Sequence, residues 1–224
     1  MGLPSFPRAQ ALFRVKRFTM TSPQMCRRLW NQCHQLLQSN VSGCFVECGV
    51  WKGGSAAIMG LALQHANQKR DLHLFDSFEG LPEPSEADGP SAAAYSSGQS
   101  SGKLSPIKRC EADLDEVQDF LFLKTRLNPA HVHFHVGWFQ ATVPAAAPRL
   151  RPIALLRLDG DWYESTRLCL EHLYPNVSPG GIIVMDDYWA WEGCRKATDE
   201  YRQTHQIITP IIRTGVGAGY WAKS

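Results

Sequence analysis

Short apolar runs alternate with segments of helical periodicity along most of the chain, and this alternation predicts an α/β fold. Strands are expected at residues 44–49, 71–76 and 130–136, at two runs within 154–188, and at 207–213 and 220–223. Helices are expected at 23–38, 56–66, 111–127, 164–174 and 191–205. Turns are expected at 178–181 and 215–219, and a proline- and alanine-rich connection at 144–152. The order predicts a doubly wound, mostly parallel seven-stranded sheet with an antiparallel edge strand.

Acidic residues follow both apolar runs of the segment 154–188. Asp159 and Asp161 come after the first run, and Asp186 and Asp187 come after the second. A helix between the runs makes the two strands parallel, so both pairs lie at the edge of the sheet where such folds bind ligands. Carboxylates this close repel one another unless a cation lies among them, and oxygen ligands suit Mg²⁺ or Mn²⁺. The segment therefore predicts a divalent-metal site.

A glycine turn follows the strand at 44–49 and leads into a helix of small residues. Its spacing is Glu-x-Gly-x-x-x-Gly, from Glu47 through Gly49 to Gly53, and it differs from the Gly-x-Gly-x-x-Gly of dinucleotide folds. A carboxylate facing the ligand repels a pyrophosphate and attracts a sulfonium group, which favours S-adenosylmethionine over NAD. Asp76 ends the next strand, where an acid can bond to ribose hydroxyls. An ordinary tight turn, with Asp76 as a turn or capping residue, is the alternative.

Residues 79–110 are rich in Gly, Pro, Ser and Ala and lack a clear periodicity. A long insertion inside a compact domain is typically a lid, a binding loop or a disordered segment. Because it follows the second strand, we expect it to lie over the ligand edge as a mobile cover.

Three histidines alternate along the strand at 130–136, so His131, His133 and His135 share one face. Such a face could bind zinc. With no acid or cysteine nearby in sequence, a polar strand face without metal is the favoured interpretation. Trp138 follows this strand and could stack on an adenine, or it could be a core residue.

The chain of 224 residues, with a net charge of +2, is expected to form one domain over 1–224, with an N-terminal arm and helix over 1–40. Its short basic runs do not resemble a nucleic-acid footprint, and no run approaches the length of a membrane span. The N-terminal residues lack the apolar core of a signal peptide, and the seven cysteines include no Cys-x-x-Cys pair. We therefore expect a reduced, cytoplasmic setting, with partners that are neither nucleic acid nor membrane.

Six ordered motifs from about Thr19 to Trp221 resemble the macrocin-type sugar O-methyltransferases. They are FVECGVWKGGS, LFDSFEGLPEP, GWF, RLDGDWYEST, SPGGIIVMDDY and GAGYW. The resemblance implies a class I methyltransferase fold, which is Rossmann-like, with S-adenosylmethionine as methyl donor and Mg²⁺ at the acidic strand ends. It further implies a role in natural-product biosynthesis, a small-molecule hydroxyl acceptor and the possibility of a homo-oligomer.

Residue by residue, the resemblance implies three metal ligands, which are Asp159, Asp186 and Asp187. It also implies a set of cofactor-binding residues, which are Thr19, Met20, Glu47, Gly49, Val50, Gly53, Ser55, Asp76, Ser77, Phe78, Trp138 and Phe139.

Transfer to a hydroxyl needs a proton acceptor near the metal. Asp161, two residues past Asp159, is the candidate base, and an outer carboxylate or turn role is its alternative; Trp162 and Tyr163 are candidates for the acceptor side. A sugar, a polyol or a catechol-like vicinal diol would suit a chelating metal.

Two other functions remain open. One is a glycosyltransferase that uses Asp159-Gly160-Asp161 to hold Mn²⁺ and a diphosphate, and the other is a non-catalytic S-adenosylmethionine-binding module.

Overall fold

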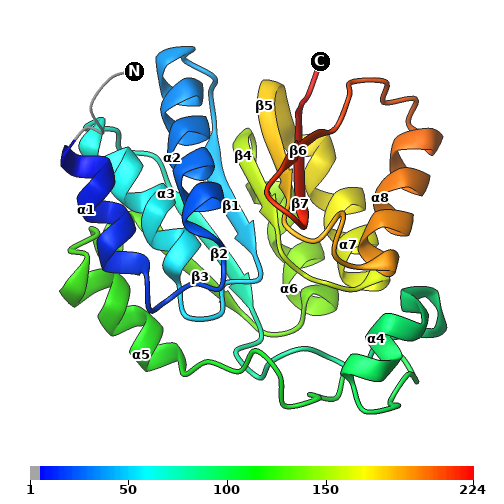
Figure 1. The fold of residues 1–224 in the computed structure, drawn as a ribbon. Coiled ribbons are helices and arrows are strands. Elements are labelled where there is room, and N and C mark those ends of the chain that lie inside the picture. The colour runs from blue at the N-terminus through cyan, green and yellow to red at the C-terminus, as the bar shows by residue number, and fades with distance from the viewer. Residues whose placement is uncertain (1–5) are drawn as a thin grey trace.

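The computed structural model describes residues 6–224, so the first five residues of the expected N-terminal arm lie outside the described part. Seven strands form one sheet in the order β3-β2-β1-β4-β5-β7-β6, with helices on both faces (Figure 1). The strands are β1 (Cys44–Cys48), β2 (Leu72–Asp76), β3 (Val132–Val136), β4 (Ile153–Leu158), β5 (Val177–Met185), β6 (Ile212–Thr214) and β7 (Ala218–Ala222). The predicted doubly wound α/β sheet is confirmed. Its antiparallel strand is β7, which pairs with β5 and β6 and so lies one place in from the edge.

Helices α1, α2, α3 and α5 cover one face of the sheet, and α6, α7 and α8 cover the other (Figure 1). The helices are α1 (Phe6–Val15), α2 (Pro23–Gln38), α3 (Gly54–His65), α4 (Gly89–Tyr95), α5 (Leu114–Asp119), α6 (Phe139–Ala146), α7 (Tyr163–Leu173) and α8 (Glu192–Thr204). None of these helices is both long and apolar enough to cross a membrane.

Two hydrophobic clusters, one on each face, hold the helices to the sheet. Strand β4 lies at the centre and contributes to both, because Leu155 packs into one cluster and Leu156 into the other. All six of its residues are buried, which explains why its sequence is almost continuously apolar. The exception is Arg157, whose guanidinium is buried with them.

Several element boundaries differ from the sequence predictions. Helix α1 was not expected, and the predicted helix 111–127 is a short α5 continued by a π-helical turn at Phe120–Lys124. Helix α6 was not expected either. It begins at Phe139 and ends inside the expected connection region, and Pro144, which suggested a connection in the sequence, lies in its last turn. The predicted strand 207–213 is limited to β6.

The expected turn at 178–181 lies within β5. Gly180 has φ of 78°, and the register between β4 and β5 shifts at this point, from Ile153 opposite Val177 to Leu155 opposite Ile182. Glycines thus mark an irregularity inside a strand, as they often do.

The segment that joins α1 to α2 crosses the N-terminal end of α3. The Gly54 N–H donates a hydrogen bond of 2.8 Å to the Phe18 carbonyl oxygen. A Cβ atom on Gly54 would lie 2.4 Å from that oxygen and 2.5 Å from the Thr19 Cβ atom. The close approach places Thr19 and Met20 over the carboxyl edge of the sheet.

Gly54→Ala should therefore lower the free energy of unfolding by about 1–3 kcal/mol, because the clash is with backbone that cannot move without displacing the arm. Gly60→Ala in the same helix is the matched control. Its Cβ would meet only the flexible end of Leu127, at 2.4 Å, and alanine favours the helix. Urea unfolding of both variants measures the difference, and equal losses would contradict this account of the arm.

Candidate metal and cofactor site

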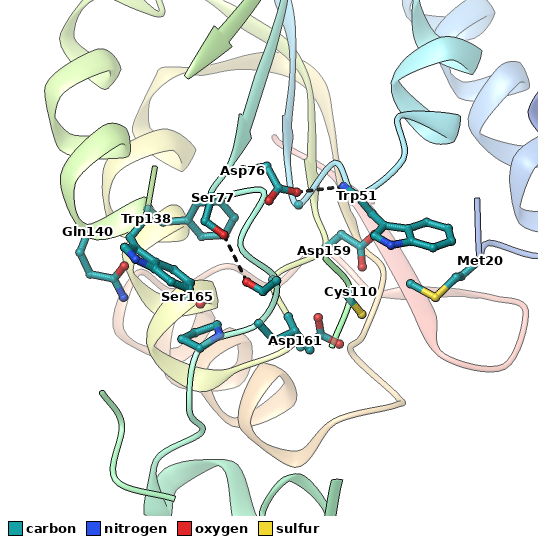
Figure 2. A pocket seen from close by; sticks show the side chains of 16 residues that line it. Met20, Trp51, Asp76, Ser77, Cys110, Trp138, Gln140, Asp159, Asp161 and Ser165 are labelled. Carbon is teal, nitrogen blue, oxygen red and sulfur yellow. Dashed lines mark hydrogen bonds between the residues drawn. The ribbon is translucent and has the colours of Figure 1, made fainter. Parts of the chain in front are cut away.

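A cleft of about 610 Å³ opens at the carboxyl edge of the parallel strands (Figure 2). Its walls include eight of the residues expected at the site, which are Met20, Gly49, Asp76, Ser77, Trp138, Phe139, Asp159 and Asp161. Sequence reasoning missed Trp51 and the other wall residues, which are Gly80, Leu81, Pro82, Cys110, Gln140, Gly160 and Ser165.

A second cavity of about 570 Å³ continues from the first and shares Met20, Trp51, Cys110, Asp159 and Asp161 with it. Its walls add further expected residues, which are Thr19, Val50, Ser55, Asp186 and Asp187. The structure thus brings expected metal and cofactor residues from six separate segments of the chain to one continuous site.

Three residues expected to bind the cofactor are not on the walls of either cavity. Glu47 is fully buried behind them, and Gly53 adopts φ of 81° to begin α3, where it packs against Val117. Phe78 packs beside Phe134, with ring centroids 6.2 Å apart. These three residues support the shape of the site from behind, and the sequence pattern could not distinguish that position from the wall.

The carboxylates of Asp159, Asp186 and Asp187 form a cluster in which one oxygen of each lies within 4.8 Å of the others. The register explains the convergence, because Leu158 of β4 lies opposite Met185 of β5 and the acids follow directly. Each donor is an oxygen, which is the set that Mg²⁺ and Mn²⁺ favour.

Arg157 lies among these acids and is 2% exposed. Its NH1 atom donates to Glu47 Oε1 and to Asp159 Oδ2, both at 2.8 Å, and its NH2 atom lies 2.8 Å from Asp186 Oδ1. It therefore joins carboxylates from three adjacent segments of the sheet edge. Sequence reasoning missed Arg157, although a lone arginine inside an apolar strand signals buried acids around it.

Burial raises the pKa of the acids around Arg157. The pKa of Asp186 rises to about 6 and that of Glu47 to about 8, even though the Arg157 charge opposes both shifts. Burial and then the charges of Asp161, Asp159 and Asp186 raise the pKa of Asp187 well above its usual range. One arginine does not balance these carboxylates, so a bound divalent cation fits the excess negative charge.

Asp161 faces both cavities and does not belong to the cluster of three. It adopts φ of 56°, which turns its side chain toward the cleft, and its Oδ1 atom accepts a 2.7 Å bond from the Trp191 indole N–H. Burial and the charge of Asp159 raise its pKa to about 8. The Tyr163 hydroxyl, expected near the acceptor, instead bonds to Glu200 on the outer surface.

The glycine turn packs directly against the first acid. Gly49 has φ of 92°, and a Cβ atom there would lie 1.9 Å from the Asp159 carbonyl oxygen. Asp76 Oδ2 accepts a 2.9 Å bond from the Trp51 N–H group (Figure 2). It also accepts a 2.7 Å bond from the Val50 N–H group, and so holds the turn in place. The turn role of Asp76 is therefore present, and its carboxylate also remains on the wall of the cleft.

The segment 79–110 lies at the carboxyl edge of the sheet (Figure 1). Specific hydrogen bonds hold it there. Pro82 pairs with Pro106 in an isolated bridge, and the Pro82 carbonyl oxygen accepts a 2.9 Å bond from the Trp162 indole N–H. Asp88 is buried and accepts bonds from the N–H groups of Ser85, at 2.7 Å, and of Tyr163, at 2.5 Å. Residues near the two ends of the segment, Gly80–Pro82 and Cys110, thus line the cleft, and Asp88 attaches the segment to the start of α7.

The strand order, the antiparallel β7 and the acidic cleft at the carboxyl edge define a class I methyltransferase. Residues 13–223 match the family described as Macrocin-O-methyltransferase (TylF). The chain belongs to this family of O-methyltransferases, which decides against the glycosyltransferase alternative.

Two curated relatives and one solved structure illustrate the similarity. The chain is 36% identical over 205 residues to demethyldecarbamoylnovobiocin O-methyltransferase of Streptomyces niveus, covering 88% of this chain and 74% of the relative. It is 37% identical over 188 residues to the 8-demethyl-8-(2,3-dimethoxy-alpha-L-rhamnosyl)-tetracenomycin-C 4'-O-methyltransferase of Streptomyces olivaceus, covering 83% and 68%. The structure of the O-methyltransferase NovP matches with a TM-score of 0.80 and 31% identity, covering 92% of this chain and 82% of that one.

Arg157→Met should lower the free energy of unfolding by about 3–5 kcal/mol in buffer containing EDTA, because it leaves buried carboxylates without their counter-charge. Glu47→Gln is the matched control. Because the pKa of Glu47 is raised to about 8, its carboxyl is largely protonated at pH 7, and an amide of the same shape should cost little. Urea unfolding compares the two variants. A loss with Arg157→Met no larger than that with Glu47→Gln would contradict the role of Arg157.

Asp88→Ala should detach the cover, because the Ser85 and Tyr163 N–H groups lose their acceptor. We expect faster tryptic cleavage at Lys103 and Lys108, which are exposed within the cover, as measured by limited proteolysis and mass spectrometry. Glu86→Ala, a change at an exposed acid in the same turn, is the control. Equal cleavage rates in both variants would show that Asp88 does not hold the segment.

Proposed function

We propose that this protein transfers a methyl group from S-adenosylmethionine to a hydroxyl of a glycosylated natural product, with Mg²⁺ held by Asp159, Asp186 and Asp187. The observation that carries the proposal is the convergence of these three carboxylates on a cleft that also contains Asp161. The name of the Streptomyces olivaceus relative supports a sugar hydroxyl as acceptor, because that enzyme acts on a rhamnosyl group.

The donor set and the uncompensated charge fit a divalent ion, and Mn²⁺ could replace Mg²⁺. Asp159, Asp186 and Asp187 would hold such an ion, which would supply Lewis-acid chemistry that lowers the pKa of an attacking hydroxyl. The protein contributes rigidity, because Arg157 fixes the orientation of Asp159 and Asp186 through bonds of 2.8 Å. A positioned site of this kind needs little rearrangement during the reaction.

Asp161 is the proposed proton acceptor. It faces the cleft next to Asp159. Its ionised form is the proton acceptor, and this form is a stronger base than an ordinary aspartate because burial and the charge of Asp159 raise its pKa. The bond from Trp191 leaves the second carboxylate oxygen, Oδ2, available to take the proton of the attacking hydroxyl.

The cofactor would lie between the glycine turn and the residues that follow β3. Trp138 and Phe139 give this part of the cleft an aromatic wall suited to an adenine, and Asp76, which also lines the cleft, suits ribose hydroxyls. The acids around Asp159 attract a positively charged sulfonium. Met20, at 68% exposed, would cover the donor from the N-terminal arm.

We further propose that the chain acts as one domain, with segment 79–110 as the cover of the acceptor. Tyr95 of this segment lies beside Trp191, with ring centroids 5.3 Å apart, and Trp191 lies 5.1 Å from Trp162. The three rings form an apolar boundary next to Asp161. A closed cover would exclude water from the reacting groups.

Asp159→Asn should abolish methyl transfer while binding of S-adenosylmethionine persists, and Asp161→Asn should lower kcat by about 10²–10⁴-fold. Labelled donor measures transfer to deoxysugar-bearing acceptors, and calorimetry measures binding of the donor. EDTA should abolish transfer, and added Mg²⁺ should restore it. Asp119→Asn, on the outside of α5, is the control. Full activity after chelation, or loss of donor binding together with turnover in Asp159→Asn, would refute the division between metal and cofactor residues.

A further inference from the structure

A second cluster of metal-binding side chains lies on β2 and β3, away from the acidic cleft. His131, His133 and His135 share one face of β3 and its entry, and the register places His73 of β2 directly opposite His133. Asp71 lies immediately before β2, on the same face of the sheet as His73. The acid that the histidine face lacked in the linear sequence therefore comes from the neighbouring strand.

The donor atoms of this cluster have spacings that suit a single small ion. Asp71 Oδ1 lies 3.0 Å from His131 Nδ1 and 3.4 Å from His133 Nε2, and His73 Nδ1 lies 3.1 Å from His135 Nε2. Donor atoms of Asp71, His73 and His133 all lie within 4.8 Å of one another. Ligands of a tetrahedral zinc ion with Zn–N distances of about 2.0–2.1 Å are separated by about 3.3 Å.

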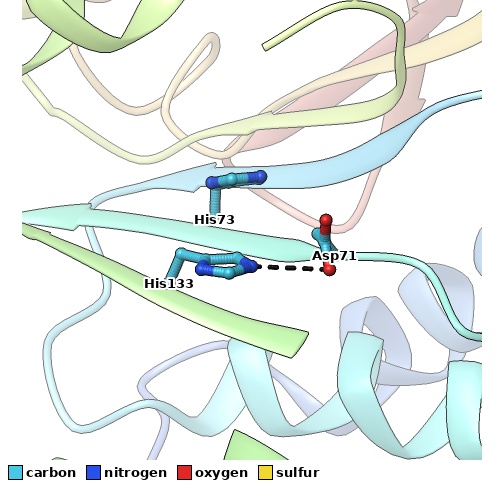
Figure 3. A group of neighbouring side chains, drawn as sticks. All are labelled: Asp71, His73 and His133. Atoms are coloured by element: carbon cyan, nitrogen blue, oxygen red, sulfur yellow. Dashed lines mark ion pairs between the residues drawn. The ribbon is translucent and has the colours of Figure 1, made fainter. Parts of the chain in front are cut away.

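We propose that Asp71, His73 and His133 form a zinc-binding site that is separate from the acidic cleft. His131, which already contacts Asp71, is placed to supply a fourth ligand. Figure 3 shows the His133 ring with one nitrogen directed at Asp71 and the His73 ring beside it on the adjacent strand. The two imidazole rings lie nearly parallel, with centroids 4.7 Å apart and planes inclined by 21°.

The chemistry of the donors selects a different ion from that of the cleft. Imidazole nitrogen with one carboxylate suits Zn²⁺ and related transition metals, whereas Mg²⁺ prefers oxygen alone.

The position of the cluster allows an ion to enter and gives it a structural effect. The side chains of His133 and Asp71 are 42% and 49% exposed. Strand β3 is at the edge of the sheet and pairs only with β2 among the described strands, so an ion held by both would fasten the edge. Zinc should therefore stabilise the folded protein by binding to it.

Calorimetric titration of metal-stripped protein with Zn²⁺ tests the proposal, with Asp159→Asn as the background so that the acidic cleft does not contribute. We expect about one ion per chain, a rise in Tm with zinc, and the visible absorption of a tetrahedral site with Co²⁺. His133→Ala and Asp71→Asn should each weaken zinc binding by about tenfold or more. His172→Ala, at an exposed histidine of α7, should leave it unchanged.

Unchanged zinc affinity in both His133→Ala and Asp71→Asn would overturn the proposal, as would equal loss in His172→Ala. So would the absence of a Tm shift and of Co²⁺ absorption, which would leave a hydrogen-bonded polar face without metal. Circular dichroism establishes that each variant folds. Asp71→Asn, which preserves the shape of the side chain at an exposed position, keeps the test decisive if His133→Ala does not fold.

Discussion

The ion pairs of Arg157 with the acids around it are the interactions on which the site depends. The guanidinium lies within the most buried strand of the sheet, and a charge there is tolerable only when opposite charges and hydrogen bonds surround it. Asp159 and Asp186 supply charge at the ends of β4 and β5, and Glu47 of β1 supplies a hydrogen-bond acceptor. The bonds that offset the cost of burying Arg157 also hold two proposed metal ligands, Asp159 and Asp186, in place. The stability of the sheet and the geometry of the site therefore depend on the same interactions.

The topology determines where this charge cluster faces. The order of strands reverses between β1 and β4, because β1 is followed by β2 on one side and β4 by β5 on the other. Ligands of such sheets bind at this reversal. Here the two chain segments approach so closely that only glycine fits at position 49 beside the Asp159 carbonyl. The cleft is thus formed by the backbone as much as by the side chains that line it.

The sequence predicted the strands, the parallel pairing and the acids at their carboxyl ends, because hydrophobic periodicity and position along a strand are local properties. It did not predict partnerships between distant residues. Arg157 could be placed only by knowing which strands flank β4, and Asp71 joins the histidines only through pairing of β2 with β3. Glu47, Gly53 and Phe78 lie near the expected site in sequence, yet the side of the chain that each presents depends on packing.

The contact between Trp191 and Asp161 has an optical consequence. An indole ring whose N–H donates to a carboxylate at 2.7 Å experiences that group's electric field directly. Its fluorescence responds when the field changes, whether through a new neighbouring charge or through loss of the bond. Trp191 is therefore a built-in spectroscopic reporter beside the cleft, and changes at the acidic centre can be followed in solution without an attached dye.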